Sequence, residues 1–225
     1  MQIDALTTPA EETAAARSSL YRLLADGFVY PDDACFAALK AGRYRDDVQG
    51  ICDALPYDLE PAYDGLVASG TYTDFQAEYL RLFELGTGMS PCPLFSGLYQ
   101  GGRKAVMEEL TRFYHFFGLS IEQGAGELPD HVTTELEFMH FLTFKELVAL
   151  RQSEDAAPCR RAQADFLERQ LVSWLPALEE RLQKLEPPTF YVALVWLTNA
   201  VARAELDSLR QTLERTATIP LEARS

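Results

Sequence analysis

A Glu-x-x-His spacing is the first pattern in this chain that could do chemistry. Glu137 and His140 lie three residues apart, which places both side chains on one face of a helix. Di-iron helical bundles use two such motifs together with two further carboxylates. The chain has 3 histidines, and neither His115 nor His131 has a carboxylate three residues before it. The second motif is therefore missing, and His140 is more simply a helix residue packed beside the core.

A second polar group, Asp130, His131 and Glu135, could do acid–base chemistry or bind a metal ion. His131 and Glu135 are four residues apart, so their side chains can meet on a helix. No further ligand stands at a spacing typical of zinc sites. We favour a helix start at which Asp130 lies at or near the N-cap, beside a local polar pair. The sequence therefore predicts no metal and no cofactor, and a small helical metalloenzyme built on His131, Glu135, Glu137 and His140 is the rival hypothesis.

Motifs for nucleotide binding and nucleophilic catalysis are missing from the sequence. There is no GxxxxGK[ST] loop, and Ser96 lies in Phe-Ser-Gly rather than in a GxSxG elbow. Cys92 stands between two prolines, and no base that could activate its thiol is indicated. The chain is therefore predicted not to be an enzyme.

Composition and charge exclude further classes. The chain has 225 residues, and 34 acids against 20 bases give a net charge of −14. This charge argues against nucleic-acid binding and against a polybasic membrane surface, and it leaves a basic partner open. The 4 cysteines form no CxxC pair, and neither a secretory signal nor an apolar stretch long enough to span a membrane is present. We therefore expect a cytoplasmic protein with reduced thiols.

Apolar residues recur at helical spacing along most of the chain. The pattern predicts helices over about 11–27, 34–39, 73–83, 104–117, 130–150, 159–185 and 189–213, with a bend at Pro176 in the sixth. Residues 43–69 give no clear pattern, because Pro56 and Pro61 interrupt them. We expect one all-α domain over residues 1–225, a helical bundle with a frayed tail after about residue 216.

Four segments, taken in order, resemble one known family. They are EYLRLF at 78–83, PCPLFSGLY at 91–99, ELPDH at 127–131 and ELEF at 135–138. Their order and gaps are similar to those of the TorD/DmsD/NarJ family of molybdoenzyme-specific assembly chaperones, over about residues 73–150. The stretch FSGLYQGGRKAVMEEL looks most similar to chaperones of nitrate-reductase-like enzymes, the type II DMSO reductase family that acts on hydrocarbons, dimethyl sulfide, selenate and chlorate.

The resemblance implies an all-helical, TorD-like cytoplasmic protein and names its partners. Such proteins bind the catalytic subunit of a molybdopterin-dependent oxidoreductase until its cofactor is inserted. Many also bind its N-terminal twin-arginine leader and delay export. The residues that the resemblance assigns to client binding are Phe83, Pro91, Pro93, Phe95, Ser96, Tyr99, Asp130 and His131, with Glu78, Tyr79, Arg81 and Glu135 in support.

These residues also suit a leader by their chemistry. Asp130 could pair with a leader arginine, and aromatic side chains such as Phe95 and Tyr99 could cover the apolar segment that follows. Glu78 and Arg81 are more simply a structural ion pair, and Phe83 is equally a core residue. The tryptophans that some leader-binding members carry around this loop are missing, which leaves open a member that guards only folding and cofactor insertion. A general acidic adaptor for basic peptides is a further alternative, because acids far outnumber the single base Arg81 between residues 46 and 84.

Overall fold

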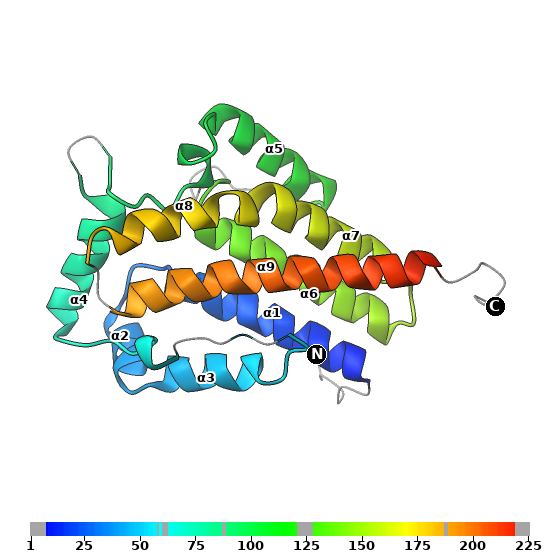
Figure 1. Cartoon of the computed structure of the whole chain (residues 1–225), viewed down its shortest axis with the longest axis horizontal. Coiled ribbons are helices and arrows are strands. Elements are labelled where there is room, and N and C mark those ends of the chain that lie inside the picture. Colours follow the sequence, from blue (N-terminus) through cyan, green and yellow to red (C-terminus); the bar gives the residue numbers. More distant parts are fainter. Residues whose placement is uncertain are drawn as a thin grey trace.

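The computed structural model describes residues 8–57, 59, 63–86, 89–120, 128–186 and 189–218, with side chains to residue 215. Across these residues the chain is helical, and strand geometry is confined to one isolated bridge between Phe95 and His131. The prediction of an all-α fold is confirmed. Long helices run along the longest axis of the molecule, and the short helices α2 (Asp33–Lys40) and α4 (Tyr72–Tyr79) gather at one end (Figure 1).

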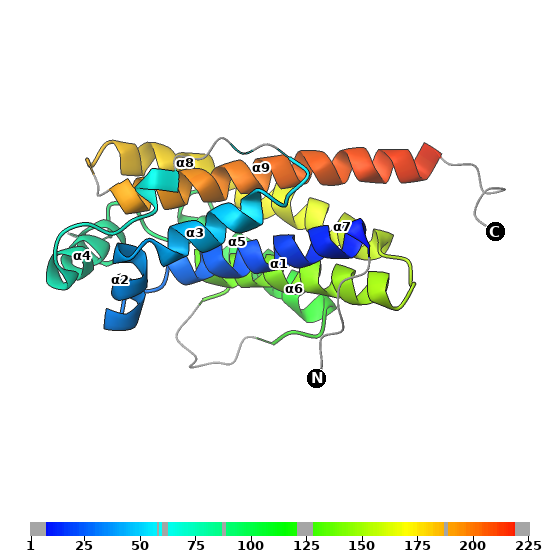
Figure 2. The ribbon, with the colours of Figure 1, turned by 90° about the horizontal axis from the view of Figure 1, so that it is seen from below.

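Helices α1 (Pro9–Gly27) and α6 (Val132–Arg151) form one packed pair of the bundle. Helix α1 begins at Pro9, before the predicted start at residue 11, because the Thr8 side chain accepts a hydrogen bond from the Glu11 amide at 3.2 Å and Pro9 occupies the first turn. Apolar side chains three and four residues apart on each helix are buried in the core between them. The two helices lie side by side in both views (Figures 1 and 2).

Helices α7 (Ala157–Phe166), α8 (Val172–Gln183) and α9 (Thr189–Thr218) complete the bundle. Helix α9 packs on both α7 and α8, and Figure 2 shows it beside α8. The bend expected at Pro176 stays a prediction. The irregular turn is a π-helical stretch at Leu167–Leu171, and Pro176 lies inside α8. A proline cannot donate to the carbonyl four residues earlier, here that of Val172, and α8 continues through this position.

The short helices carry an aromatic cluster into the core. Helix α4 starts with a capping box between Thr71 and Asp74 and ends in a π-helical turn at Leu80–Glu84. The rings of Phe75 and Tyr191 stack with centroids 5.1 Å apart. Helix α3 (Arg43–Cys52) was not predicted, although both of the prolines that obscured it lie after its end. The tail expected to fray after residue 216 is helical to Thr218, and residues 219–225 lie outside the described part.

Helix α5 (Arg103–Phe116) lies outside the bundle, along the side formed by α7 and α8 (Figure 1). The loop 89–102 leads into it from α4, and Gly118 ends it with a φ of +74°. Across the described residues, no helix combines the length and the apolar character needed to cross a membrane.

Candidate functional site at the junction of a loop and helix α6

The loop before α5 is joined to the start of α6 by its backbone. The Ser96 amide donates to the Asp130 carbonyl at 2.8 Å, and the Val132 amide donates to the Leu94 carbonyl at 2.8 Å. These two bonds form the isolated bridge between Phe95 and His131. The bridge therefore brings together two segments that the sequence separates by more than 30 residues, and we call this region the loop junction, defined by residues 91–103 and 130–135.

Asp130 is bound to Arg103 of this same chain. Its carboxylate is fully buried and accepts from Arg103 Nε at 2.8 Å and from a second guanidinium nitrogen at 3.3 Å. The expectation that Asp130 caps α6 is wrong, because His131 is the N-cap and its Nδ1 accepts from the Thr133 amide. A leader arginine could reach Asp130 only in place of Arg103.

Glycine at position 97 permits this ion pair. A Cβ added there would lie 2.7 Å from Arg103 Cγ, 2.8 Å from Arg103 Cα and 3.0 Å from Asp130 Oδ2. Contacts this short would force the loop away from the Arg103 backbone. The sequence did not single out Arg103 as a partner of Asp130. The signal lay in the Gly101-Gly102-Arg103 helix start, which places that arginine beside the loop.

Two rings stand at the surface of the loop junction, above this ion pair. The rings of Phe95 and His131 meet edge to face with centroids 5.0 Å apart, and both residues are half-buried. The Arg103 guanidinium lies over the Phe95 ring, 4.7 Å from its centroid. A cation stacked on an aromatic face holds the ring in place. The half-buried Phe95 ring is therefore held between the Arg103 guanidinium and the His131 ring, and its role in client binding stays a prediction.

Glu135 lies beneath the rings, fully buried, and accepts from the Trp174 indole N–H at 3.0 Å. Burial raises the pKa of Glu135 to about 8, an effect that the Ser96 hydroxyl and the Trp174 indole offset only in part. Its other oxygen and the Ser96 hydroxyl are buried with no hydrogen-bond partner of standard geometry. The carboxyl group is thus poised to hold its proton at neutral pH.

Tyr99 is placed between two further side chains. Its ring stacks on Trp174 with centroids 5.3 Å apart, and the Arg181 guanidinium lies 4.5 Å from its centroid. Burial raises the pKa of the Tyr99 hydroxyl well above its ordinary range. The indole that lies under this loop comes from α8. The loop itself lacks tryptophan, but Trp174 packs against it from a position 75 residues after Tyr99 in the chain.

The remaining predicted residues divide between core and surface. Tyr79 and Phe83 are buried, and the Tyr79 hydroxyl donates to the Phe28 carbonyl at 2.9 Å. Glu78 and Arg81 form the expected ion pair at 2.7 Å on the outside of α4 and its π-turn. Proline 91 is exposed and Pro93 is buried, on either side of a buried Cys92 thiol whose pKa burial raises to about 11.

The residues of the rival metal site are directed elsewhere. The Nδ1 atom of His140 lies 2.9 Å from the Ser18 hydroxyl and 2.8 Å from the Ser18 carbonyl, so it packs against α1. Glu137 is exposed and Glu135 is held by Trp174. In the part of the chain that the structure describes, no group of three His, Cys, Asp or Glu side chains is arranged to hold a metal ion.

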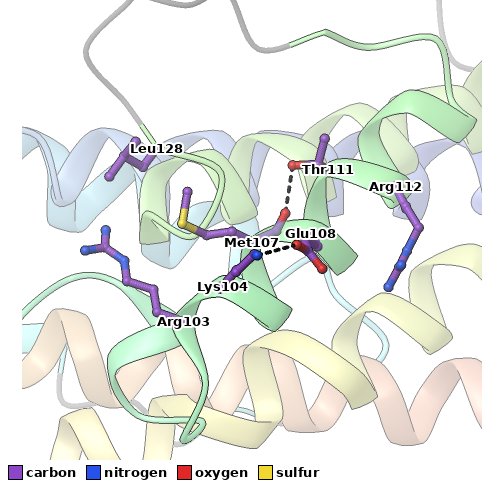
Figure 3. Close-up of a pocket in the computed structure, with 7 residues that line it drawn as sticks. All are labelled: Arg103, Lys104, Met107, Glu108, Thr111, Arg112 and Leu128. Atoms are coloured by element: carbon purple, nitrogen blue, oxygen red, sulfur yellow. Dashed lines mark hydrogen bonds and ion pairs between the residues drawn. The ribbon is translucent and has the colours of Figure 1, made fainter.

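An open groove of about 790 Å³ lies beside the loop junction, along α5. Figure 3 shows Arg103 and Arg112 at opposite ends of it, with Met107 between them and Leu128 across from the helix. Lys104, Glu108 and Thr111 complete its lining. Sequence reasoning missed this groove, because its residues follow one another every three or four positions on an ordinary amphipathic helix.

Three proteins similar to this chain are named as assembly chaperones. The perchlorate reductase assembly chaperone protein of Dechloromonas aromatica is 35% identical over 205 residues, covering 88% of this chain and 92% of the relative. The selenate reductase assembly chaperone protein of Thauera selenatis is 36% identical, covering 75% and 77%. The dimethyl sulfide dehydrogenase assembly chaperone protein of Rhodovulum sulfidophilum is 30% identical, covering 84% and 80%.

The family follows from these matches. A family model described as the nitrate reductase delta subunit matches residues 43–180, and the chain belongs to this family, the TorD/NarJ group of assembly chaperones. The resemblance read from the four short segments is confirmed. The prediction of a chaperone rather than an enzyme is confirmed as well, because the relatives are named as chaperones.

Proposed function

We propose that this protein binds the catalytic subunit of a molybdopterin-dependent oxidoreductase in the cytoplasm, before the cofactor is inserted. The names of the relatives support a client that resembles perchlorate reductase, selenate reductase or dimethyl sulfide dehydrogenase. Release would follow when the client has taken up its cofactor and folded. We propose that residues 1–225 form one domain.

We propose further that the loop junction binds the client's twin-arginine leader. The observation that carries this is the half-buried pair of Phe95 and His131, fixed at the surface by a backbone bridge and an ion pair. The apolar segment of the leader would cover Phe95 and Tyr99. Its basic end would be drawn by the net charge of −14.

The twin arginines need a carboxylate, and Asp130 is already bound by Arg103. We propose an exchange in which a leader arginine takes the place of Arg103, whose side chain is 36% exposed while that of Asp130 is fully buried. The Arg103 side chain can turn into the open groove along α5, which it already lines. Such an exchange costs little, because one bidentate arginine–carboxylate pair replaces another.

A pull-down from the native host tests this function. The tagged full-length chain would be recovered from cells grown by anaerobic respiration, and its partners read by mass spectrometry. Wild-type protein should recover one molybdopterin-enzyme catalytic subunit, and Phe95→Ala with His131→Ala should lose it. The matched control is Phe144→Ala with His115→Ala, which removes an exposed Phe and an exposed His outside the loop junction. Failure of wild type to recover such a subunit would overturn the proposal.

The acidic-adaptor alternative makes a different prediction about the leader. A site that senses only charge would accept leader lysines in place of arginines, whereas exchange at Asp130 needs the planar fork of a guanidinium. Equal affinity for the two leaders, measured by fluorescence anisotropy, would favour the adaptor. Metal analysis of purified protein addresses the metalloenzyme, because stoichiometric iron or zinc would revive it.

A further inference from the structure

A second surface lies on the opposite side of α5 from the backbone bridge of the loop junction. It is a groove of about 560 Å³ between α5 and α7, which we call the α5–α7 groove. Its lining combines aromatic rings with charged side chains: Glu109, Arg112, Phe113, Phe116, Phe117, Pro158, Arg161, Ala162, Asp165 and Arg169. None of these residues was predicted to bind the leader.

The groove presents an aromatic ring to solvent. The side chain of Phe116 is 83% exposed, the largest fraction for any large apolar residue in the described part of the chain. It stacks edge to face on Phe117 at 5.1 Å, and Phe117 contacts the buried Phe138 at 5.7 Å. The ring is thus placed on a support that reaches the core. An exposed ring that stands in a groove among charged groups offers an anchor for an apolar side chain of a partner.

The charge of the groove is opposite to that of the molecule. Arg169 is paired with Glu109 and lies 3.6 Å from Asp165, so these three groups together carry a charge of −1. No ion pair joins Arg112 or Arg161 to another side chain within the described residues. The charged side chains that line the groove are therefore three arginines and two acids, a net charge of +1, although the chain carries −14 overall.

We propose that the α5–α7 groove docks an acidic segment of a partner protein, in which an aromatic or large aliphatic side chain stands next to carboxylates. The apolar side chain would pack on Phe116, and the guanidinium forks of Arg112 and Arg161 would bind the carboxylates. The same charges repel a twin-arginine leader. This step rests on the proposed function. If the partner is the client of that function, the groove binds the part of the catalytic subunit that follows the leader.

The positive strip continues toward the loop junction. Arg112 also lines the groove of Figure 3, where Arg103 stands at the other end and Lys104 lies between them beside Glu108. Lys104 is only weakly paired, at 3.9 Å from Glu108, and its side chain is 91% exposed. An acidic segment seated beside Phe116 can therefore extend along α5 while the basic leader occupies the loop junction. The two surfaces select segments of opposite charge.

Peptide binding to the full-length chain tests the inference. The probe is a fluorescein-labelled peptide in which Phe and Leu alternate with Glu, compared with one carrying Lys for Glu and one carrying Ala for Phe and Leu. Fluorescence anisotropy should show binding of the first peptide alone, weakened by salt. Arg112→Glu with Arg161→Glu, and separately Phe116→Ala, should each reduce its affinity by about tenfold, the effect of losing a central contact.

Matched variants control for charge and for fold. Arg43→Glu reverses an exposed arginine on α3, and Val29→Ala removes an apolar side chain that is 49% exposed; neither should change the affinity. The groove positions are at the surface, so the variants should keep the wild-type melting temperature. Binding of the Lys peptide as tight as that of the Glu peptide, or unchanged affinity in the groove variants, would overturn the inference.

The same titrations separate this inference from the proposed function. Phe95→Ala with His131→Ala should lose a twin-arginine leader peptide and keep the acidic peptide, and the groove variants should do the reverse. If the leader fails to bind wild type while the acidic peptide binds through the groove, the leader site alone is refuted. If the leader binds and the acidic peptide does not, the groove alone is refuted.

Discussion

At the scale of single residues, Asp130 depends on a partner 27 residues earlier in the chain. Its buried carboxylate is bound through two nitrogens of Arg103. Asp130→Ala leaves that guanidinium without its counter-charge, and breaking a buried pair typically costs about 3–5 kcal/mol. Because Arg103 can turn toward solvent, we expect the free energy of unfolding to fall by roughly 3 kcal/mol in urea denaturation.

An exposed ion pair provides the control for this prediction. Asp26 pairs with Arg22 at 3.3 Å on the outside of α1, so Asp26→Ala should cost less than about 1 kcal/mol. Equal losses in the two variants would contradict a structural role for Asp130. Leader binding is therefore tested with Phe95 and His131, because loss of the His131 N-cap should cost about 1 kcal/mol, less than the loss expected for Asp130→Ala.

Glu135 predicts a pH dependence of stability. Burial raises its pKa from an ordinary 4.5 to about 8, so the folded state holds a proton that the unfolded state releases. The free energy of unfolding should therefore fall as pH rises from about 4.5 to about 8, by at most about 1.4 kcal/mol per unit from this group. Glu135→Gln removes the effect, so its stability relative to wild type should increase with pH.

Urea denaturation of both proteins between pH 5.5 and about 8 measures this difference. The control is Glu137→Gln, an exposed glutamate two residues further on the same helix. Its stability relative to wild type should not change with pH. A difference between Glu135→Gln and wild type that stays constant over this range would show that Glu135 is ionised in the folded protein.

At the scale of single residues, the sequence predicts what lies close along the chain. Glu78 and Arg81 were expected to pair because three residues separate them on a helix, and they do so at 2.7 Å. The partner of Asp130 could not be predicted in this way. That contact requires knowing that the loop crosses the start of α6, which depends on two backbone hydrogen bonds between distant segments.

At the scale of elements, the loop junction depends on a glycine. Gly97 lies against the Arg103 backbone, where an added Cβ would lie 2.8 Å from Arg103 Cα. Gly97→Ala should therefore displace the loop and cost about 1–3 kcal/mol, the range for overpacked sites. Hydrogen exchange should also show faster exchange of the Ser96 amide, which is bonded to the Asp130 carbonyl.

Gly50 gives the matched comparison. It lies inside α3, and an added Cβ would meet no atom within 4 Å. Gly50→Ala should therefore stabilise the protein by about 0.5–1 kcal/mol, since alanine favours a helix interior over glycine. Thermal denaturation of the two variants should give melting temperatures shifted in opposite directions. A Gly97→Ala variant as stable as wild type would contradict the close packing of the loop.

The helices were predictable where apolar residues repeat over a long stretch, and less so elsewhere. Helix α1 was expected at 11–27 and is found at Pro9–Gly27. Helix α3 was missed because its 10 residues carry few apolar side chains and prolines follow it closely. One helix with a bend at Pro176 was expected over 159–185, whereas α7 and α8 are joined by a π-helical turn at Leu167–Leu171, which no residue pattern in the sequence indicates.

At the scale of the whole molecule, one buried polar network joins helices that the sequence gives no reason to connect. Arg17 of α1 binds Glu146 of α6 at 2.8 Å and also pairs with Glu205 of α9. Arg160 of α7 binds the same Glu146 at 2.6 Å. On the sequence these residues look like the polar face of amphipathic helices, so their burial follows only from the packing of four helices around them.

We expect this network to make the helices that it joins unfold together. Arg17→Ala leaves two buried carboxylates without their shared cation, which should lower the free energy of unfolding by about 3–5 kcal/mol. Burial opposes ionisation of Glu146, but Arg17 and Arg160 outweigh it and lower its pKa. The stability that Glu146 contributes is therefore present above its ordinary pKa of 4.5 and is lost as pH falls below it.

Urea denaturation at neutral pH tests the loss expected for Arg17→Ala. Repeating it at about pH 4 tests the loss of the stability that Glu146 contributes. Arg22→Ala removes an exposed arginine from the same helix and should cost less than about 1 kcal/mol. Equal losses for Arg17→Ala and Arg22→Ala would contradict the network. Replacing Arg17, Glu146, Arg160 and Glu205 together by methionine should recover most of the loss, because a packed apolar core commonly matches a buried ionic one in stability. If this variant folds as tightly but with broader unfolding transitions, the network serves to fix which helices pair rather than to stabilise them.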